Sequence, residues 1–301
     1  MKKIWFLVLS FIFVLSLFSC NNKEIVIEPD SFSENITISY LGPKGTYTEE
    51  ASELFFKNKG TYNPYENVKL AVEALINNEA NYSVIPQENT IGGAVIDYID
   101  IVLEKEELSV VGEIELPITQ NLLVYNGATL SDIKKVYSHK QGILQGADYI
   151  KENLPGVEVV EVSSTAEGAR LVSEEKDKSV AAIASLSAAK LYNLDILAKS
   201  IQKNDNNKTR FYVLSKDKPR ESNKDRIAFI AKGKTKELPN LLKRINEENA
   251  NLITIHDRPL KTILGEYYYL IECSNITYEK YLKIINDINF NFRYLGSFNV
   301  V

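Results

Sequence analysis

The sequence predicts an α/β fold with largely parallel sheets, followed by a smaller α/β unit at the C-terminus. Two observations support this prediction. Short apolar and β-branched runs alternate with segments of helical spacing from residue 36 to about residue 192, which is typical of strand–helix–strand units. After a charged break at residues 215–224, the order changes to strand, helix, two strands, helix and strand.

The first predicted unit begins near Asn35. Residues 36–41 alternate as a strand does, residues 42–45 predict a turn, and residues 46–56 have helical spacing. Thr46 or Thr48 is the expected N-cap of this helix. A strand, a glycine-containing turn and a helix N-terminus in succession present backbone N–H groups to an anionic ligand.

The same alternation continues through the rest of this unit. Open sheets of this kind bind ligands at the carboxyl ends of their strands, where the loops collect. We therefore expect the functional residues in those loops. The predicted helices cover residues 68–77, 93–103, 142–152, 165–174 and 186–192, and the predicted strands cover 82–85, 110–116, 120–125, 135–137, 157–162 and 180–184.

The charged break at residues 215–224 has almost no apolar content and predicts a linker. The sequence therefore divides into a first domain over residues 35–214 and a second over residues 225–301. The β-α-β-β-α-β order of the second domain predicts a ferredoxin-like fold. Its predicted elements are strand 226–231, helix 237–248, strands 252–256 and 267–273, helix 278–288 and strand 292–297.

Composition indicates a globular chain and speaks against two classes of function. The chain has 301 residues, of which 45% are hydrophobic and 25% charged, enough for two or three folding units with cores of their own. A net charge of −5 leaves no basic surface for phosphates, which speaks against a nucleic-acid partner. Two histidines, no paired cysteines and no His-Glu-x-x-His spacing speak against a metal site.

The N-terminus predicts a secreted, lipid-anchored protein. Residues 1–19 place two lysines ahead of an apolar run that is too short to span a bilayer, and Leu17-Phe18-Ser19-Cys20 resembles the bacterial lipoprotein cleavage box. We expect a signal peptide over residues 1–19, lipidation of Cys20, a tether over residues 20–34, and a membrane-anchored location in the periplasm or on the outer surface. The alternatives are a cleaved signal with an incidental cysteine, and an unused signal on a cytosolic protein.

Four short motifs occur along the chain in a definite order. They are Leu41-Gly42-Pro43-Lys44-Gly45-Thr46-Tyr47-Thr48, Pro86-Gln87-Glu88-Asn89-Thr90, Ser138-His139-Lys140-Gln141 and Asn207-Lys208-Thr209-Arg210-Phe211. In this order and at these intervals they resemble the signature motifs of the prephenate dehydratases. The resemblance runs from about Ile36 to the C-terminus, and four motifs in register are far more specific than any one of them.

The resemblance implies a lyase that removes carboxylate and a ring hydroxyl from prephenate, giving phenylpyruvate for L-phenylalanine synthesis. Arogenate, the amino analogue, stays open as a second substrate. Such a site must supply a proton to the departing hydroxide, donors for two carboxylates and a dry pocket, and it implies no cofactor. The resemblance also implies a two-lobed catalytic domain similar to type II periplasmic binding proteins, a phenylalanine-sensing ACT domain, and a homodimer or homotetramer.

The resemblance assigns the chemistry to four residues. Thr209 matches the threonine that the family uses at the leaving group, so we expect it to donate a proton or hydrogen bond to that hydroxyl. Glu88 and Asn89 follow a predicted strand and are expected to point into the cleft. There Asn89 would donate to substrate oxygens, and Glu88 would orient Asn89 or Arg210. Ser138 is the expected contact from the second lobe.

The expected substrate-binding residues supply donors and an aromatic wall. Arg210 has a guanidinium fork that suits a carboxylate, and Thr46 and Thr48 would add hydroxyl and backbone donors at a helix N-terminus. His139 is expected either to cap or pack, or to take part in acid–base chemistry. The substrate-binding set is Arg210, Thr46, Thr48, Gln141 and Phe211.

Several positions depart from the family's pattern. Tyr98 replaces a threonine, and we expect its ring to narrow the cleft. Gln120 stands where the family has histidine. In the C-terminal unit Lys236 replaces a glycine, so we expect phenylalanine inhibition to be weakened or lost. The expected effector-binding residues are Leu238, Arg258 and Pro259.

A second hypothesis is a lipoprotein that binds a small carboxylated metabolite without turning it over. The four catalytic positions and Arg210 favour catalysis, whereas Tyr98 and Gln120 favour binding alone. The retained motifs outweigh the two departures, so the sequence favours the enzyme.

Overall fold

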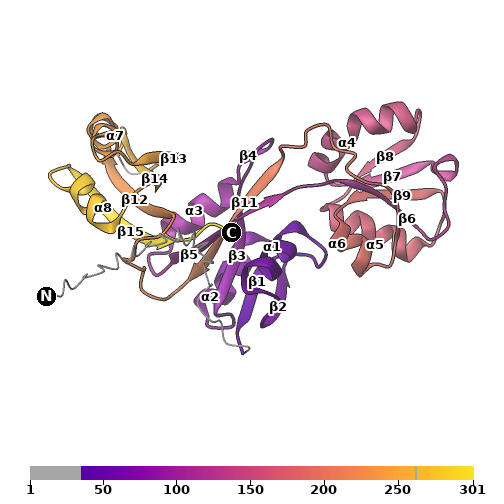
Figure 1. Ribbon diagram of the computed structural model, residues 1–301, viewed down its shortest axis with the longest axis horizontal. Coiled ribbons are helices and arrows are strands. Elements are labelled where there is room, and N and C mark those ends of the chain that lie inside the picture. The colour runs from indigo at the N-terminus through magenta and orange to yellow at the C-terminus, as the bar shows by residue number, and fades with distance from the viewer. Residues whose placement is uncertain (1–34, 262) are drawn as a thin grey trace, which may run out of the picture. The chain divides into compact units, whose positions relative to one another are not determined.

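The computed structural model describes residues 35–261 and 263–301 and arranges them on three β-sheets (Figure 1). The predicted signal peptide, Cys20 and the tether lie outside the described residues. Within the described residues, no helix has the length and apolar character needed to cross a bilayer.

The first sheet has six strands, which are β1 (Thr37–Leu41), β2 (Thr61–Tyr65), β3 (Tyr82–Asn89), β4 (Gly93–Ala94), β5 (Ser109–Pro117) and β11 (Lys208–Ser215). Their order is β2-β1-β3-β11-β5, with β4 on β3. β1 is parallel to β2 and β3, but β11 is antiparallel to both of its neighbours. The prediction of largely parallel sheets is therefore wrong. The chain leaves this sheet through β5 and returns beside it through β11, so these two strands run in opposite directions.

Three helices belong to this part of the chain, namely α1 (Tyr47–Phe56), α2 (Val68–Ile76) and α3 (Ile96–Glu104). α1 begins where the sequence predicts, with Thr46 as its N-cap. Gly45, in the turn before it, has a φ of 82°, a left-handed conformation that glycine adopts without strain. α3 begins three residues later than predicted, because the short strand β4 precedes it.

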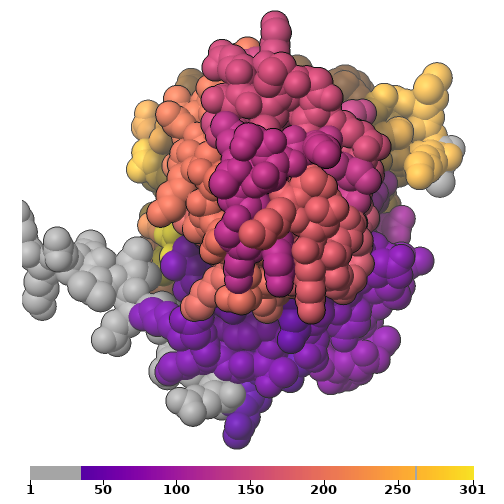
Figure 2. Space-filling view, turned by 90° about the vertical axis from the view of Figure 1, so that its right-hand side faces the viewer, coloured from indigo at the N-terminus to yellow at the C-terminus, as the bar shows by residue number. Residues whose placement is uncertain are grey.

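The second sheet has five strands, which are β6 (Asn121–Val124), β7 (Lys135–Ser138), β8 (Glu158–Glu161), β9 (Val180–Ala184) and β10 (Asp195–Ala198). Their order is β10-β6-β9-β7-β8, and this sheet is also mixed, since β6 is antiparallel to β9 and β10. Its helices are α4 (Lys140–Asn153), α5 (Thr165–Glu175) and α6 (Leu186–Leu191). Figure 2 looks onto the face that this sheet and its helices form. The predicted strands do not include β2 and β10, which are edge strands, the two-residue strand β4, or β11, which lies between β3 and β5.

Two chain segments join the first and second sheets and run side by side. One connects β5 to β6, and the other connects β10 to β11. Ile118 N donates to Asn207 O at 2.9 Å, and Ile201 N donates to Gln120 O at 2.8 Å. The paired segments therefore bring the strand ends of one sheet near the helix N-termini of the other.

The C-terminal sheet has four antiparallel strands, which are β12 (Arg226–Lys234), β13 (Asn251–Pro259), β14 (Glu266–Ser274) and β15 (Phe290–Phe298). With α7 (Leu238–Glu247) and α8 (Tyr278–Ile285) they have the predicted order β-α-β-β-α-β. α7 and α8 pack against apolar residues of this sheet, among them Phe229 and Ile271. Other strand residues, including Ile230 and Leu295, belong to the hydrophobic core of α3, β5 and β11. The C-terminal sheet therefore shares a core with the first sheet.

Tyr98 on α3 lies in that shared core. Its side chain is fully buried and meets the rings of Tyr212 and His256 edge to face, at centroid distances of 5.8 and 6.2 Å. The expectation that Tyr98 narrows the cleft is wrong. The face of α3 that carries residue 98 packs on the core, and only the segment before the helix, including Val95, reaches the pocket described below.

Candidate active site

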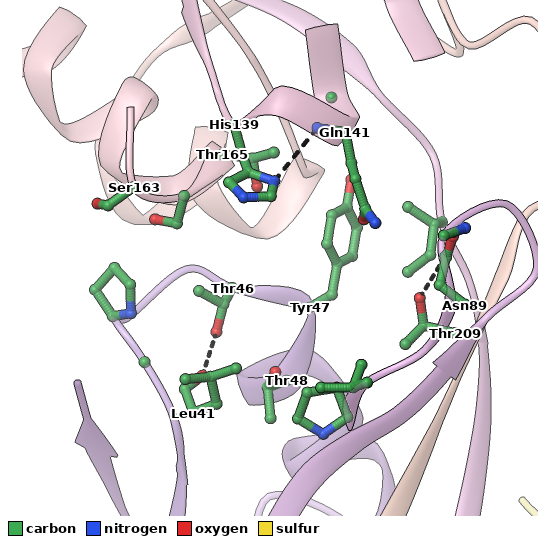
Figure 3. Close-up of a pocket in the computed structure, with 18 of the residues that line it drawn as sticks. Leu41, Thr46, Tyr47, Thr48, Asn89, His139, Gln141, Ser163, Thr165 and Thr209 are labelled. Atoms are coloured by element: carbon green, nitrogen blue, oxygen red, sulfur yellow. Dashed lines mark hydrogen bonds between the residues drawn. The ribbon is translucent and has the colours of Figure 1, made fainter. Parts of the chain in front are cut away.

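A pocket of about 920 Å³ lies where the strand ends of the first sheet meet the helix N-termini of the second. The first sheet contributes the residues after β1, the end of β3 and the start of β11. The second contributes the N-termini of α4 and α5. In Figure 3, Thr46 and Thr48 face His139 and Thr165 across the pocket. This is the position at which open α/β sheets bind ligands.

Three helices that begin at this pocket have a side-chain cap, and α3 also begins here, after Val95, without one. The three side-chain N-caps are Thr46 for α1, His139 for α4 and Ser164 for α5. Each N-cap side chain accepts a hydrogen bond from its own helix, at 3.4 Å for Thr46, 3.4 Å for His139 and 2.9 Å for Ser164. The N-terminus of a helix carries about half a positive charge and unpaired N–H groups. Three such termini around one cavity suit a ligand with more than one negative group.

The charged side chains of the pocket are acidic. Among the described residues that line it, Glu66 and Glu167 carry carboxylates and none is Lys or Arg. Hydrogen bonds from Arg170 lower the pKa of Glu167, so this carboxylate stays ionised and paired. An anionic ligand therefore meets hydroxyl, amide and backbone N–H donors here, rather than a cationic side chain.

Thr209 and Asn89 form a hydrogen-bonded pair on the pocket wall. They are register partners on β11 and β3, and Asn89 Nδ2 lies 2.9 Å from Thr209 Oγ1. The orientation of the Asn89 amide follows from its other contacts, because Oδ1 accepts from Ile91 N at 3.0 Å and Gly92 N at 2.9 Å. Nδ2 is therefore a donor, and its two hydrogens serve Thr209 Oγ1 together with Asn207 Oδ1 at 2.9 Å and Lys208 O at 3.2 Å. The Thr209 oxygen accepts one of these bonds, which leaves its own O–H directed elsewhere and free for a ligand.

Most of the residues predicted to be catalytic or substrate-binding lie in this pocket. His139 lines it as well, as the N-cap of α4, which is one of the two roles expected for it. Gln141 follows in the first turn of the same helix. The predicted residues that line the pocket are Thr46, Thr48, Asn89, Gln141, Thr209 and Phe211.

Arg210 and Glu88 lie on the opposite face of the sheet, which corrects their expected placement in the cleft. Successive side chains in a strand point to opposite faces, so Arg210 points away from the pocket that Thr209 and Phe211 line. Its guanidinium pairs with Glu113 at 2.7 Å, Glu272 at 2.5 Å and Glu88 at 3.2 Å. Glu88 thus contacts Arg210, one of the two partners expected for it, but outside the pocket.

Ser138 also lies outside the pocket lining. It is fully buried at the end of β7, and its hydroxyl donates to Ile183 O at 2.8 Å. This hydrogen bond links neighbouring strands of the second sheet, so the predicted direct contact with substrate is wrong. Its motif neighbours His139 and Gln141 reach the pocket because the chain turns into α4 immediately after it.

The expected effector residues lie in the C-terminal unit. Arg258 pairs with Asp100 of α3 through two hydrogen bonds, of 2.6 and 2.8 Å. Leu238 packs partly buried against the core of this unit, and Pro259 ends β13. The Arg258 guanidinium is therefore engaged by the first sheet's α3.

Sequence reasoning missed several lining residues. Ser163, Ser164 and Thr165 border the pocket at the start of α5, and Tyr47 borders it at the start of α1. The signal for the first three was present, because Ser-Ser-Thr between a strand and a helix is the same pattern that indicated Thr46. The Tyr47 hydroxyl donates to Thr119 O at 2.5 Å, and burial raises its pKa, so it stays protonated.

Gln120, noted from the sequence as a departure, lies in the pocket wall. Its side chain is almost completely buried, and Nε2 lies 3.0 Å from Oε1 of Gln145, another lining residue. Its backbone N–H donates to Gln202 Oε1 at 2.9 Å. Gln120 therefore joins the pocket wall to the paired segments between the sheets.

The buried carboxyl of Glu113 predicts a pH-dependent stability. Burial, together with the charge of Glu272, raises the pKa of Glu113 from 4.5 to about 7, although Arg210 and Arg226 oppose the shift. A carboxyl with a higher pKa in the folded state binds its proton more tightly there. The stabilisation that the tighter proton binding of Glu113 gives the folded state is thus complete below about pH 4.5. It is lost as the pH rises through about 7.

Between about pH 5 and about pH 8 the free energy of unfolding of the wild type is expected to fall relative to that of Glu113→Gln. Burial lowers the pKa of His256, which acts in the opposite direction but is present in both proteins. Urea unfolding at a series of pH values measures both. Glu115→Gln is the control. Burial acts to raise the pKa of Glu115, but the Arg226 guanidinium outweighs it and lowers that pKa, so the effect of Glu115 lies below this pH window. An unchanged slope in Glu113→Gln would count against the raised pKa.

Known proteins resemble this chain over the residues that form the pocket. The sequence model described as "PDT: Prephenate dehydratase" matches residues 38–219. The chain is 34% identical over 282 residues to the "Bifunctional chorismate mutase/prephenate dehydratase" of Aquifex aeolicus, covering 92% of this chain and 77% of that protein. It is 35% identical over 248 residues to the "Prephenate dehydratase" of Methanocaldococcus jannaschii, covering 80% of this chain and 89% of that protein.

Solved structures give the same result. The crystal structure of the prephenate dehydratase from Staphylococcus aureus has a TM-score of 0.76 and 30% identity, over 88% of this chain and 100% of that one. The Arthrobacter aurescens prephenate dehydratase in complex with L-Phe has a TM-score of 0.78 and 28% identity, over 88% of this chain and 90% of that one. The matched residues include all four motifs and the whole pocket, so this chain belongs to the prephenate dehydratase family.

Proposed function

We propose that this protein is a prephenate dehydratase, a carbon–oxygen lyase that converts prephenate to phenylpyruvate, carbon dioxide and water. The observation that carries the proposal is the Thr209–Asn89 pair in a pocket bordered by three helix N-termini. A lyase for this substrate needs a donor at the leaving hydroxyl and sites for two carboxylates. We assign the first role to Thr209 and the second to the helix N-termini.

In this proposal Thr209 donates its free O–H to the departing ring hydroxyl. Asn89 holds the Thr209 oxygen from the other side and stabilises negative charge that develops on it. A threonine hydroxyl is a weak acid in water, so the role needs a site that excludes solvent. Phe211, which is buried on the same face of β11, supplies apolar wall beside Thr209.

The two substrate carboxylates are assigned to the helix N-termini. Thr46 and Thr48 begin α1 on one side of the pocket, and Gln141 and Thr165 stand at the starts of α4 and α5 on the other. Backbone N–H groups and hydroxyls of a helix N-terminus bind carboxylates without a cationic side chain. Arogenate has the same two carboxylates, so we include it as a second substrate.

We assign the domains as the sequence suggests. Residues 35–214 form a catalytic domain with two lobes similar to those of type II periplasmic binding proteins, and residues 225–301 form an ACT domain. The β-α-β-β-α-β order supports the second assignment. The Arthrobacter aurescens relative is described in complex with L-Phe. Here Arg258 is held by Asp100 and Lys236 replaces a glycine, which favours weakened phenylalanine regulation.

The proposal also covers assembly and location. β13 pairs only with β14 in the described part of the chain, so its outer edge is open to a second copy in a homodimer or homotetramer. The cleavage-box sequence ending at Cys20 supports a lipid anchor and a location outside the cytoplasm. Palmitate labelling that depends on Cys20 is the test of the anchor.

Phenylpyruvate formation by purified residues 21–301 tests the activity. We expect turnover of prephenate without added metal or cofactor, with arogenate and formation of phenylalanine measured in parallel. A folded protein that converts neither substrate would overturn the lyase assignment.

A further inference from the structure

A group of charged side chains lies on the face of the first sheet that is turned away from the pocket, opposite Thr209 and Asn89, which we call the catalytic pair. We call this group the buried ion cluster. Glu113 and Glu272 in it are fully buried, and the two arginine side chains are 13% exposed. Its members are Arg210, Arg226, Glu88, Glu113, Glu115 and Glu272.

The two arginines share their carboxylates. Besides the contacts of Arg210 given above, Arg226 Nη1 lies 2.5 Å from Glu113 Oε1 and 2.8 Å from Glu272 Oε1. Its Nη2 lies 2.6 Å from Glu115 Oε1. Glu113 and Glu272 therefore each contact both guanidiniums, so each carboxylate helps to hold both arginines in place.

The register of β3 and β11 places this cluster directly behind the catalytic residues. Thr209 is paired with Asn89, and the next pair along the strands is Arg210 with Glu88. The first pair faces the pocket and the second belongs to the cluster. Arg210 directly follows Thr209 in the chain, and Glu88 directly precedes Asn89, so one peptide unit separates each member of the cluster from a residue of the Thr209–Asn89 pair.

The C-terminal sheet supplies two members of the cluster, Arg226 from β12 and Glu272 from β14. Glu272 is held on its other side by Tyr212 Oη at 2.6 Å and Gln87 Nε2 at 3.1 Å. Its carboxylate thus joins the C-terminal sheet to β3 and β11 together. A bulge in the pairing of these two strands lies between Arg210 and Phe211, where Gln87 is the extra residue.

We propose that Glu272 is a positioning residue for catalysis, which through Arg210 holds β3 and β11 so that Asn89 and Thr209 keep their hydrogen bond. The C-terminal unit thereby contributes to the turnover step as well as to the shared core. This inference rests on the proposed lyase activity. The alternative is that the cluster stabilises the fold and has no effect on the chemistry.

The variant Glu272→Gln distinguishes the positioning role from a purely structural role, because it removes the charge of the side chain and keeps its shape. The glutamine amide nitrogen replaces Oε2, which accepts from both Gln87 Nε2 and Tyr212 Oη. Gln87 must therefore turn its Oε1 toward the new amide, and the Tyr212 hydroxyl must change from donor to acceptor. We expect kcat for prephenate to fall about tenfold with KM little changed, because a small misplacement of catalytic groups has effects of this size or larger. Glu266→Gln, on the same strand but outside the cluster, is the matched control.

A double-mutant cycle with Asn89→Ala tests the route. If Glu272 acts through the catalytic pair, Glu272→Gln is expected to lower kcat much less in the Asn89→Ala background than in the wild type. All variants are assayed as the full chain, well below their unfolding temperatures. If Glu272→Gln does not fold, Arg226→Lys replaces it, since lysine keeps the charge but cannot span Glu113, Glu115 and Glu272 together.

The outcomes decide the proposal. Unchanged kcat in a folded, less stable Glu272→Gln protein, or equal effects in both backgrounds of the cycle, would overturn the positioning role and leave the lyase assignment intact. An inactive wild-type protein would overturn both the positioning role and the lyase assignment. A fall in kcat that is absent from Glu266→Gln and smaller beside Asn89→Ala would support the positioning role.

Discussion

Replacing Thr209 with alanine is expected to lower kcat for phenylpyruvate formation at least ~100-fold, the low end for loss of a positioned proton donor. The Thr209 oxygen accepts from Asn89, which leaves its O–H for the departing hydroxyl. Steady-state kinetics with prephenate measure the effect. KM is expected to change little, since the helix N-termini that we assign to the carboxylates remain in place.

Thr209→Ser is the matched control, because serine keeps the hydroxyl and removes only the methyl group. We expect it to retain most of the activity that alanine loses. If alanine and serine were equally active, the hydroxyl would not be the donor. If both lowered activity equally, the methyl packing, and not the hydroxyl, would be the essential feature of Thr209.

Replacing Arg210 with alanine is expected to destabilise the protein by ~3–5 kcal/mol, the usual range when one partner of a buried ion pair is removed. Glu113 and Glu272 are fully buried and would then share Arg226 alone. Urea unfolding measures the free energy. Arg170→Ala is the control, because Arg170 also pairs with two glutamates, Glu167 and Glu174, but its side chain is 37% exposed and its loss is expected to cost under ~1 kcal/mol.

The same variant distinguishes the structural position of Arg210 from the role expected from sequence. A carboxylate clamp predicts a large rise in KM with unchanged stability. The ion cluster predicts lower stability and lower kcat with KM nearly constant. A large rise in KM for Arg210→Ala, with the free energy of unfolding unchanged, would support the hypothesis that Arg210 binds a substrate carboxylate.

Much of the pocket was predictable because its residues are local to recognisable patterns. Thr46 precedes a helical segment after a strand and a turn, and it caps α1 as expected. Asn89, Gln141 and Thr209 belong to motifs whose spacing indicated the family, and all three line the pocket. Residues in the turns between strands and helices collect at one edge of a sheet, so the positions of such turns along the chain already indicate where a ligand binds.

Other positions required the tertiary structure. Neighbours in a strand face opposite sides, so Thr209 and Arg210 cannot both enter the pocket, but the motif alone does not say which one does. That depends on the register of β11 with β3, which pairs Thr209 with Asn89 and Arg210 with Glu88, and on which face of the sheet the pocket covers. The same limit applies to Ser138, whose motif placed it in the site and whose hydroxyl instead bonds a neighbouring strand.

By itself, the sequence determined the class of fold, the order of the C-terminal elements, the family and the residues of the strand–helix turns. Only the tertiary structure decided that the sheets are mixed, that Tyr98 lies in the core, and that Arg210 meets Glu272, 62 residues away. Helix caps and strand alternation depend on neighbouring residues, so they can be read along the chain. The face of a strand that is covered, and by which distant side chains, depends on how the sheets pack, and no local pattern encodes it.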